Sequence, residues 1–230
     1  MGKYAGDGSG GGRSVSEVRE HFIVRLNQAL LLPGMFGGEM ALRWFLGDLA
    51  WIDGLDSAGD SIAGRLEPMG AWSPTGVRGA FAGLFGGAAR DHENAAAFVY
   101  ADLAHTWGYL APERTVACDE YVRLRGEAPA WTTSADRTIP DLVDAFGEPS
   151  LWRPKYNPRY STSVAYVSGD QSDPLIVFDF WQETDWQDRP LTSRFGPEPI
   201  LRNVRWRADR FEDGFTFTPT GTTLLARGDR

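Results

Sequence analysis

The spacing of the hydrophobic residues changes once along this chain, near residue 152, and that change constrains the fold more than any single motif. Up to residue 146, apolar residues recur every three or four positions, the spacing of a helix that buries one face. Beyond residue 152, short runs alternate between apolar and polar residues and are separated by turn residues, as in antiparallel strands. The sequence therefore predicts an α+β protein: an N-terminal bundle of four to five helices packed with a C-terminal antiparallel sheet of about four strands.

Capping signals and glycines divide the chain into segments. Ser14 with Glu17 three residues later forms a capping box, and Pro33 ends the helix that begins there. Thr138 and Asp141 repeat the capping pattern before a short helix. We expect a flexible Gly-rich tail at 1–13, a helical region at 14–128, a linker at 129–135, and a short helix plus β-meander at 136–230. The alternative is one continuous domain over 14–230.

The second predicted helix, about 39–52, follows the connector Pro33-Gly-Met-Phe-Gly-Gly38. Its apolar residues cover most of the helix circumference, which predicts a central, well-buried element; they are Met40, Trp44, Phe45, Leu49 and Ile52. Asp48 and Asp53 lie in a run without Lys or Arg and are expected to reach solvent.

Composition narrows the class of partner. The formal net charge is −8 and no basic run offsets it, so the chain is not expected to bind nucleic acid. The most apolar early segment, 22–32, is interrupted by Arg25 and is too short to cross a bilayer, so we expect no membrane segment and a cytoplasmic location. The cations are almost all Arg, a composition typical of GC-rich bacterial genomes such as those of actinobacteria. Cys118 is the single cysteine, so no intrachain disulfide is expected.

One pair of motifs resembles a hydrolase. Gly59-Asp-Ser61-Ile is similar to the nucleophile block of GDSL-type esterases, and Asp102-Leu-Ala-His105 matches the Asp-x-x-His block of that family. The resemblance implies Ser61 as nucleophile with Asp102 and His105 as its acid–base partners. In that family, however, the serine follows a strand of a parallel sheet, whereas both motifs here lie in a predicted helical region. The three histidines lack zinc-ligand spacing, and no phosphate-binding loop is present, so neither a metal nor a cofactor is expected.

A second candidate site is the acidic–aromatic segment, residues 170–188, which contains no Lys or Arg. Carboxylates beside large rings suit the binding of a basic protein, because charge steers the encounter and rings supply binding energy. Asp179 stands within an apolar strand and needs a partner, for which Arg205 or Arg207 on a neighbouring strand is suitable. The candidate partner-binding residues are Asp170, Asp173, Asp179, Phe180, Trp181, Glu183, Asp185, Trp186 and Asp188.

The connector before the apolar helix resembles an (Arg)-Pro-x-Met-(Tyr/Phe)-x-Gly pattern of small bacterial proteins of immunity-type or unassigned function, with Leu32 in place of the Arg. The resemblance covers about 25 residues. It implies a non-catalytic protein that neutralises a cognate toxin, a basic protein partner. We therefore favour a protein-binding module of the immunity type. The alternatives are a small serine hydrolase and a protein that binds a small molecule or saccharide.

Overall fold

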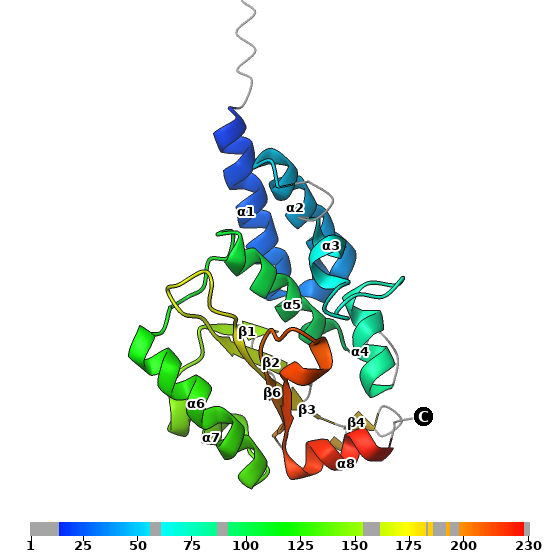
Figure 1. Ribbon diagram of the computed structural model, residues 1–230, viewed down its shortest axis with the longest axis vertical. Coiled ribbons are helices and arrows are strands. Elements are labelled where there is room, and N and C mark those ends of the chain that lie inside the picture. The colour runs from blue at the N-terminus through cyan, green and yellow to red at the C-terminus, as the bar shows by residue number, and fades with distance from the viewer. Residues whose placement is uncertain are drawn as a thin grey trace, which may run out of the picture.

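The structure, a computed structural model, describes residues 14–55, 61–86, 92–153, 162–182, 184–185, 192–193 and 198–227. Over these ranges the chain forms eight α-helices, most of them in the N-terminal half, and a five-stranded antiparallel sheet. The predicted α+β class is thus confirmed, with one strand more than expected. Figure 1 shows the helices gathered around the sheet, with the first two standing out from the rest.

Helices α1 (Val15–Leu31) and α2 (Gly38–Ile52) form a hairpin joined by the short 3-10 helix η1 (Pro33–Met35). The predicted capping box begins α1: the Ser14 hydroxyl accepts from the backbone N–H of Glu17, whose carboxylate accepts from the N–H of Ser14. Pro33 lies at the first position of η1, where a missing N–H costs nothing. Gly37 and Gly38 have φ values of +94° and +63°, so this reversal of the chain suits glycine.

Three further helices connect the hairpin to the sheet: α3 (Ile62–Leu66), α4 (Val77–Phe85) and α5 (Glu93–Thr106). The spacing of apolar residues predicts helices at about 75–85 and 92–110, which match α4 and α5 to within four residues at their ends, whereas α3 lies where a flexible connection over 54–64 is expected. Eight of the 14 residues of α5 are Ala, Phe, Tyr or Leu that are buried. Helix α5 therefore lies at the centre of the molecule, between the hairpin and the sheet (Figure 1).

The predicted linker at 129–135 is wrong, because helix α6 (Cys118–Ser134) continues through Pro129. Proline removes the N–H that would bond to the carbonyl of residue 125. Ala128 and Thr132, on either side of it, are completely buried, and Trp131 packs edge-to-face against Phe146 of the next helix. Burial of this face outweighs the lost hydrogen bond. Helix α7 (Ile139–Phe146) begins at the predicted capping box of Thr138 and Asp141.

The sheet has the strand order β1-β2-β3-β6-β7, and every pair is antiparallel. Its strands are β1 (Leu151–Arg153), β2 (Thr162–Tyr166), β3 (Ile176–Trp181), β6 (Ile200–Arg205) and β7 (Phe215–Phe217). A separate pair, β4 (Thr184–Asp185) with β5 (Thr192–Ser193), lies beyond β3. The alternation over 200–211 predicts a single strand there, but β6 ends at Arg205, and the 3-10 helix η3 (Phe211–Gly214) precedes β7. Helix α8 (Pro219–Arg227), which the sequence did not predict, follows β7.

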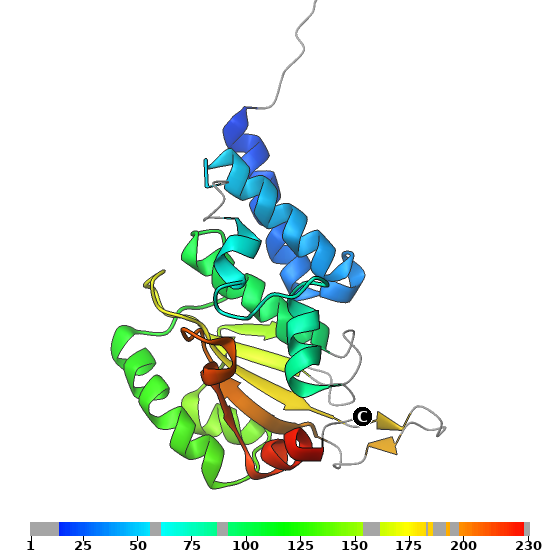
Figure 2. The same ribbon diagram turned by 45° about the vertical axis from the view of Figure 1, so that its right-hand side comes forward.

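Both faces of the sheet are covered. Alternate residues of β3 point to opposite sides: Val177 belongs to a core shared with α1, α2 and α5, whereas Ile176 and Phe178 belong to a core shared with α6 and α7. In Figure 2 the sheet lies between these two groups of helices. The first core thus combines residues of the helical half with Leu151, Ala165, Val167, Leu175 and Val177 of the β half.

Candidate functional site

The residues of the hydrolase-like motifs are engaged in separate structural contacts. Ser61 is the N-cap of α3, and its hydroxyl accepts from the N–H of Gly64 at 3.0 Å. Asp102 accepts from the N–H of Leu175 (2.8 Å) and from Arg207 (3.1 Å). His105 donates from Nε2 to the carbonyl oxygen of Asp170 (2.9 Å). Asp102 and His105 therefore hold the β2–β3 loop against α5, and the described contacts do not assemble the three residues into a nucleophile and its base.

The described part of the acidic–aromatic segment does not form one continuous surface. Asp170 is exposed, and hydrogen bonds from the N–H and hydroxyl of Ser172 hold the pKa of its carboxyl below the usual value. Asp173 accepts from the hydroxyl of Ser168 in the same loop. Trp181 lies at the far end of β3, half-buried beneath the guanidinium of Arg202. Glu183, Trp186, Asp188 and the side chain of Asp185 lie outside what the structure describes.

Asp179 and Phe180 are buried, with 3% and 2% of their surfaces exposed. The carboxylate of Asp179 accepts from Arg205 Nε (2.7 Å), Asn203 Nδ2 (2.9 Å) and Ser163 Oγ (2.6 Å). Burial would raise the pKa of Asp179, but attraction to Arg205 and Arg202 and these hydrogen bonds outweigh it and lower the pKa. The structure confirms Arg205 as the partner of Asp179, and it places both Asp179 and Phe180 in the interior of the sheet rather than at a surface.

The largest difference from the sequence prediction lies in α2, which is not buried around its circumference. Of the residues expected to be buried, Leu49 is buried, and Phe45 and Ile52 are half-buried. Met40, Trp44 and Trp51 are instead 56%, 65% and 70% exposed. With Gly47 they occupy positions i, i+4, i+7 and i+11, the spacing of one helical face. We call these four residues, Met40, Trp44, Gly47 and Trp51, the α2 stripe. Trp is normally buried on account of its area, so two exposed Trp on one face are an informative exception.

A groove runs beside the α2 stripe. It has a volume of about 410 Å³ and lies between α2 and the start of α3, with Trp72 along its wall. The guanidinium of Arg43 lies 4.6 Å from the centre of the Trp72 ring and forms one edge. Asp48, which is exposed, flanks the stripe one turn beyond Trp44. The stripe and groove together present large rings, a recess and both signs of charge.

Gly47 opens a gap between the two exposed indoles. A Cβ atom built at this position would meet nothing within 4 Å, and the backbone of Gly47 does not adopt a positive φ. Neither backbone geometry nor crowding within the chain therefore requires glycine here. Glycine inside a helix costs roughly 0.5–1 kcal/mol relative to alanine. Gly47 leaves the backbone of α2 uncovered between Trp44 and Trp51.

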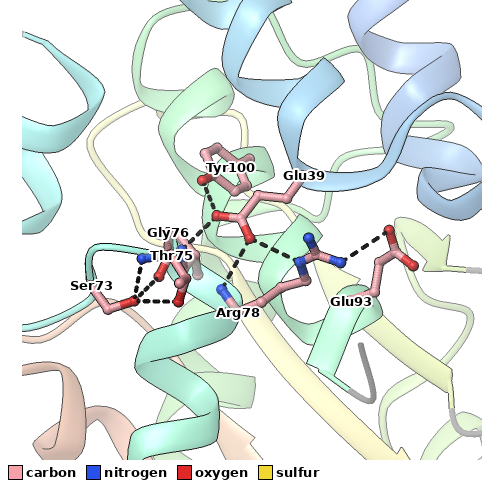
Figure 3. Close-up of polar contacts among 8 residues, drawn as sticks. Glu39, Ser73, Thr75, Gly76, Arg78, Glu93 and Tyr100 are labelled. Atoms are coloured by element: carbon pink, nitrogen blue, oxygen red, sulfur yellow. Dashed lines mark hydrogen bonds and ion pairs between the residues drawn. The ribbon is translucent and has the colours of Figure 1, made fainter. Parts of the chain in front are cut away.

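A buried carboxylate fixes α2 in place. Glu39, in the first turn of α2, is 4% exposed and accepts from the N–H groups of Val77 (2.5 Å) and Arg78 (3.2 Å) at the start of α4. It also accepts from Arg78 Nε (3.1 Å) and from the hydroxyl of Tyr100 on α5 (2.5 Å). Figure 3 shows these contacts converging on one side chain. A carboxylate at a helix N-terminus is favoured by the unpaired N–H groups and the helix dipole, and this one connects three helices.

A glycine leaves room for the Glu39 carboxylate. Gly76, immediately before α4, has a φ of +90°, and a Cβ atom there would lie 2.2 Å from Glu39 Oε1. On the far side of Arg78, Glu93 makes a longer ion pair of 3.9 Å (Figure 3). No sequence pattern indicates this cluster, because residues 39, 76 and 100 are far apart in the chain. The α2 stripe was missed for a different reason: periodicity identifies apolar residues but not the neighbours that cover them.

The described ranges bear on two possibilities, a metal site and a membrane-spanning helix. There, no group of three or more His, Cys, Asp or Glu side chains is placed to hold a metal ion. Within the same part of the chain, no helix is both long and apolar enough to cross a bilayer. Comparison with known protein families, with curated proteins and with solved structures finds no match to this chain.

Proposed function

We propose that this protein is a non-catalytic protein-binding module and that the α2 stripe is its contact surface. The observation that carries the proposal is the exposure of Trp44 and Trp51 on one face of a helix whose other faces are firmly packed. Tryptophan is among the residues most enriched at the energetic centres of protein interfaces. The anchoring of α2 by Glu39 supports the same conclusion, because a rigid surface loses little conformational entropy on binding.

Charge indicates the kind of partner. The chain carries a net charge of −8, and Asp48 lies beside the indoles of the stripe. An Arg or Lys side chain of a partner can pair with Asp48 while stacking on Trp44 or Trp51, since indole rings are the strongest cation–π acceptors among side chains. We therefore propose a basic segment of another protein as the occupant, with its backbone approaching α2 at Gly47.

The most specific form of the proposal is an immunity protein that neutralises a cognate toxin inside a bacterial, and by its composition actinobacterial, cytoplasm. Two features support it besides the resemblance of the Pro33–Gly38 connector. An enzyme that acts on nucleic acid needs a basic surface to engage phosphates, and an acidic inhibitor complements that surface and speeds association. Asp170 and Asp173 add exposed and partly exposed carboxylates at a second place on the molecule.

A growth assay tests this form of the proposal. The product of the gene adjacent to this one is expressed in a bacterial host, alone and with this protein. We expect growth arrest in the first case and rescue in the second. Rescue should fail for Trp44→Ala combined with Trp51→Ala and persist for Val122→Ala, whose residue is 63% exposed on α6. Rescue by the double variant, or an adjacent product that neither harms growth nor binds, would contradict the immunity assignment.

Affinity capture from the native organism tests the broader proposal. The wild type should retain a basic protein that the Trp44/Trp51 double variant does not retain and that Val122→Ala does. A captured protein that is acidic, or one retained equally by all three baits, would argue against the α2 stripe as the contact surface. Sedimentation of the purified protein tests whether the stripe instead binds a second copy of this chain. A wild-type dimer that is lost in the double variant would show that it does.

A further inference from the structure

A cavity of about 400 Å³ lies between α5, the loop after α3 and strands β3 and β6. Protein interiors are close-packed and contain few voids larger than a water molecule, which occupies about 30 Å³ of liquid. This volume lies within the range of roughly 300–1,000 Å³ found for small-molecule sites. The cavity shares no residue with the α2 stripe, so the inference below does not rest on the proposed function.

The walls of the cavity are mainly apolar. Phe98 of α5 is completely buried, and Phe211 and Phe215 meet edge-to-face at 5.1 Å on the side of η3 and β7. Trp206, Leu175 and Met69 extend this surface. A saccharide presents hydroxyl groups over most of its surface and would leave many of them unpaired against such walls, at a cost for each group. A ligand with an aromatic or branched-aliphatic hydrocarbon portion suits these apolar walls better than a saccharide does.

The charged side chains that line the cavity are mostly cationic. Among the described residues that line the cavity, three are arginines, Arg65, Arg205 and Arg207, and one is a carboxylate, Asp102. Arg205 is committed to Asp179 on the sheet. Arg207 donates from one terminal nitrogen to Asp102 (3.1 Å) and to the hydroxyl of Thr106 (2.7 Å), and from the other to the carbonyl oxygen of Ser172 (3.1 Å); its side chain remains 30% exposed.

Asp102 offsets this positive charge only in part. Burial raises the pKa of its carboxyl, although attraction to Arg207 and the hydrogen bond from the N–H of Leu175 oppose the rise. A guanidinium has five N–H donors in a planar fork, and the contacts with Asp102, Thr106 and Ser172 use three of them, so two remain with which Arg207 can hold a second carboxylate. An anionic group is therefore the polar feature that this lining can best accommodate.

We propose that this cavity is a binding site for a small carboxylic acid with an apolar, aromatic or branched-aliphatic body. The body lies among Phe98, Phe211, Phe215 and Trp206, and the carboxylate is held by Arg207 with Arg65 at the rim. The bound acid connects α5, β6 and η3, and it would stabilise the folded chain by mass action.

Ligand-observed NMR with a set of aromatic and branched-aliphatic carboxylates, each paired with its neutral amide, tests the site in the full-length protein. We expect at least one carboxylate to bind, to raise the melting temperature, and to bind about 10- to 100-fold more tightly than its amide, the range of a charge-assisted hydrogen bond. If the carboxylates and amides bind equally, the anionic specificity is wrong. If no member of the set binds, the site assignment itself is wrong.

Three variants locate the binding. Arg207→Gln combined with Asp102→Asn removes the guanidinium without leaving its carboxylate partner buried and charged, and should weaken carboxylate binding at least tenfold. Ala208→Leu fills the cavity and should abolish binding of carboxylates and amides alike. Arg123→Gln, on the exposed side of α6, is the matched control and should bind as the wild type does. Circular dichroism confirms that each variant is folded. Unchanged binding in both cavity variants would place the ligand elsewhere and overturn the proposal.

Discussion

At the scale of single residues, the carboxylate of Glu39 joins α2, α4 and α5 through four hydrogen bonds inside the protein. A buried carboxylate is costly unless it is fully paired, and breaking such a pairing is strongly destabilising. Burial and the charge of Glu39 raise the pKa of Tyr100, so its hydroxyl remains a donor at all physiological pH values. The orientation of the α2 stripe thus depends on a cluster that is itself remote from the surface.

The steric fit of this cluster predicts the effect of one substitution. Gly76→Ala places a Cβ atom 2.2 Å from Glu39 Oε1 and forces the carboxylate out of position. Gly147→Ala is the matched control: Gly147 has φ +77° and ψ −176°, close to the +90° and −161° of Gly76, and open space around it. Urea denaturation should show a loss of about 1–3 kcal/mol for the control, from backbone strain alone. Gly76→Ala should lose at least about 2 kcal/mol more. Equal losses would refute the role assigned to Glu39.

The lowered pKa of Asp179 predicts that the stability of the fold depends on pH. Its pKa is lowered in the folded protein, so it stabilises the fold above the unfolded value of about 3.9, and this contribution is lost as the pH falls through the folded pKa. Asp179→Asn leaves Arg205 buried without its counter-ion and should cost about 3–5 kcal/mol near neutral pH. The difference between wild type and variant should shrink as the pH falls from about 4 through the lowered pKa of the folded protein, where the wild-type carboxyl becomes neutral too. Denaturant titrations over that range measure it, and a difference that does not change with pH would contradict the assignment.

At the scale of secondary-structure elements, α2 combines a packed face with an exposed one. Substitution of Gly47, on the exposed face, distinguishes the stability of the helix from its binding of a partner. Gly47→Ala should stabilise the free protein by roughly 0.5–1 kcal/mol, because alanine favours the helix and meets no neighbour. Gly126→Ala in α6 is matched to it, since Gly126 is also exposed within a helix with open space around it. Thermal denaturation should show similar gains for both. Only Gly47→Ala should weaken partner binding, and equal binding by the two variants would remove the functional explanation for Gly47.

Element boundaries show what the sequence could and could not predict. The capping boxes at Ser14 and Thr138 were correct because such signals act locally, between residues three apart. The end of α6 was wrong because Pro129 favours a break locally, whereas the burial of Ala128 and Trp131 against α7 and the sheet depends on tertiary contacts. The exposure of Trp44 was unpredictable for the same reason: composition gives a side chain its polarity, not its neighbours.

At the scale of the whole molecule, the chain folds around a sheet whose two faces carry different helices. In β3, Val177 and Asp179 lie on one face of the sheet and Phe178 on the other, in agreement with the alternation expected of an antiparallel strand. The Asp179–Arg205 pair was also anticipated, because an isolated charge in an apolar strand demands a partner. The sequence did not indicate the Glu39 cluster or the cavity beside Arg207, because each joins residues from three or more distant segments.

The shared first core predicts how the molecule unfolds. Because α1, α2 and α5 pack with residues of β1, β2 and β3, neither half can lose its structure without exposing apolar surface of the other. We expect one cooperative transition, with far-UV circular dichroism and tryptophan fluorescence giving the same midpoint in urea. Separate midpoints for helix and tryptophan signals would show that the two halves are independent units.

The central claim is that the α2 stripe binds a basic protein, and the dissociation constant of that complex tests it most directly. Calorimetric titration of the purified partner should show at least about 100-fold weaker binding for the Trp44→Ala and Trp51→Ala double variant, because each ring is expected to be an energetic centre. Val122→Ala should bind as tightly as the wild type. The double variant should unfold within about 0.5 kcal/mol of the wild type, since both rings are largely exposed. A dissociation constant unchanged by loss of both tryptophans would contradict the account.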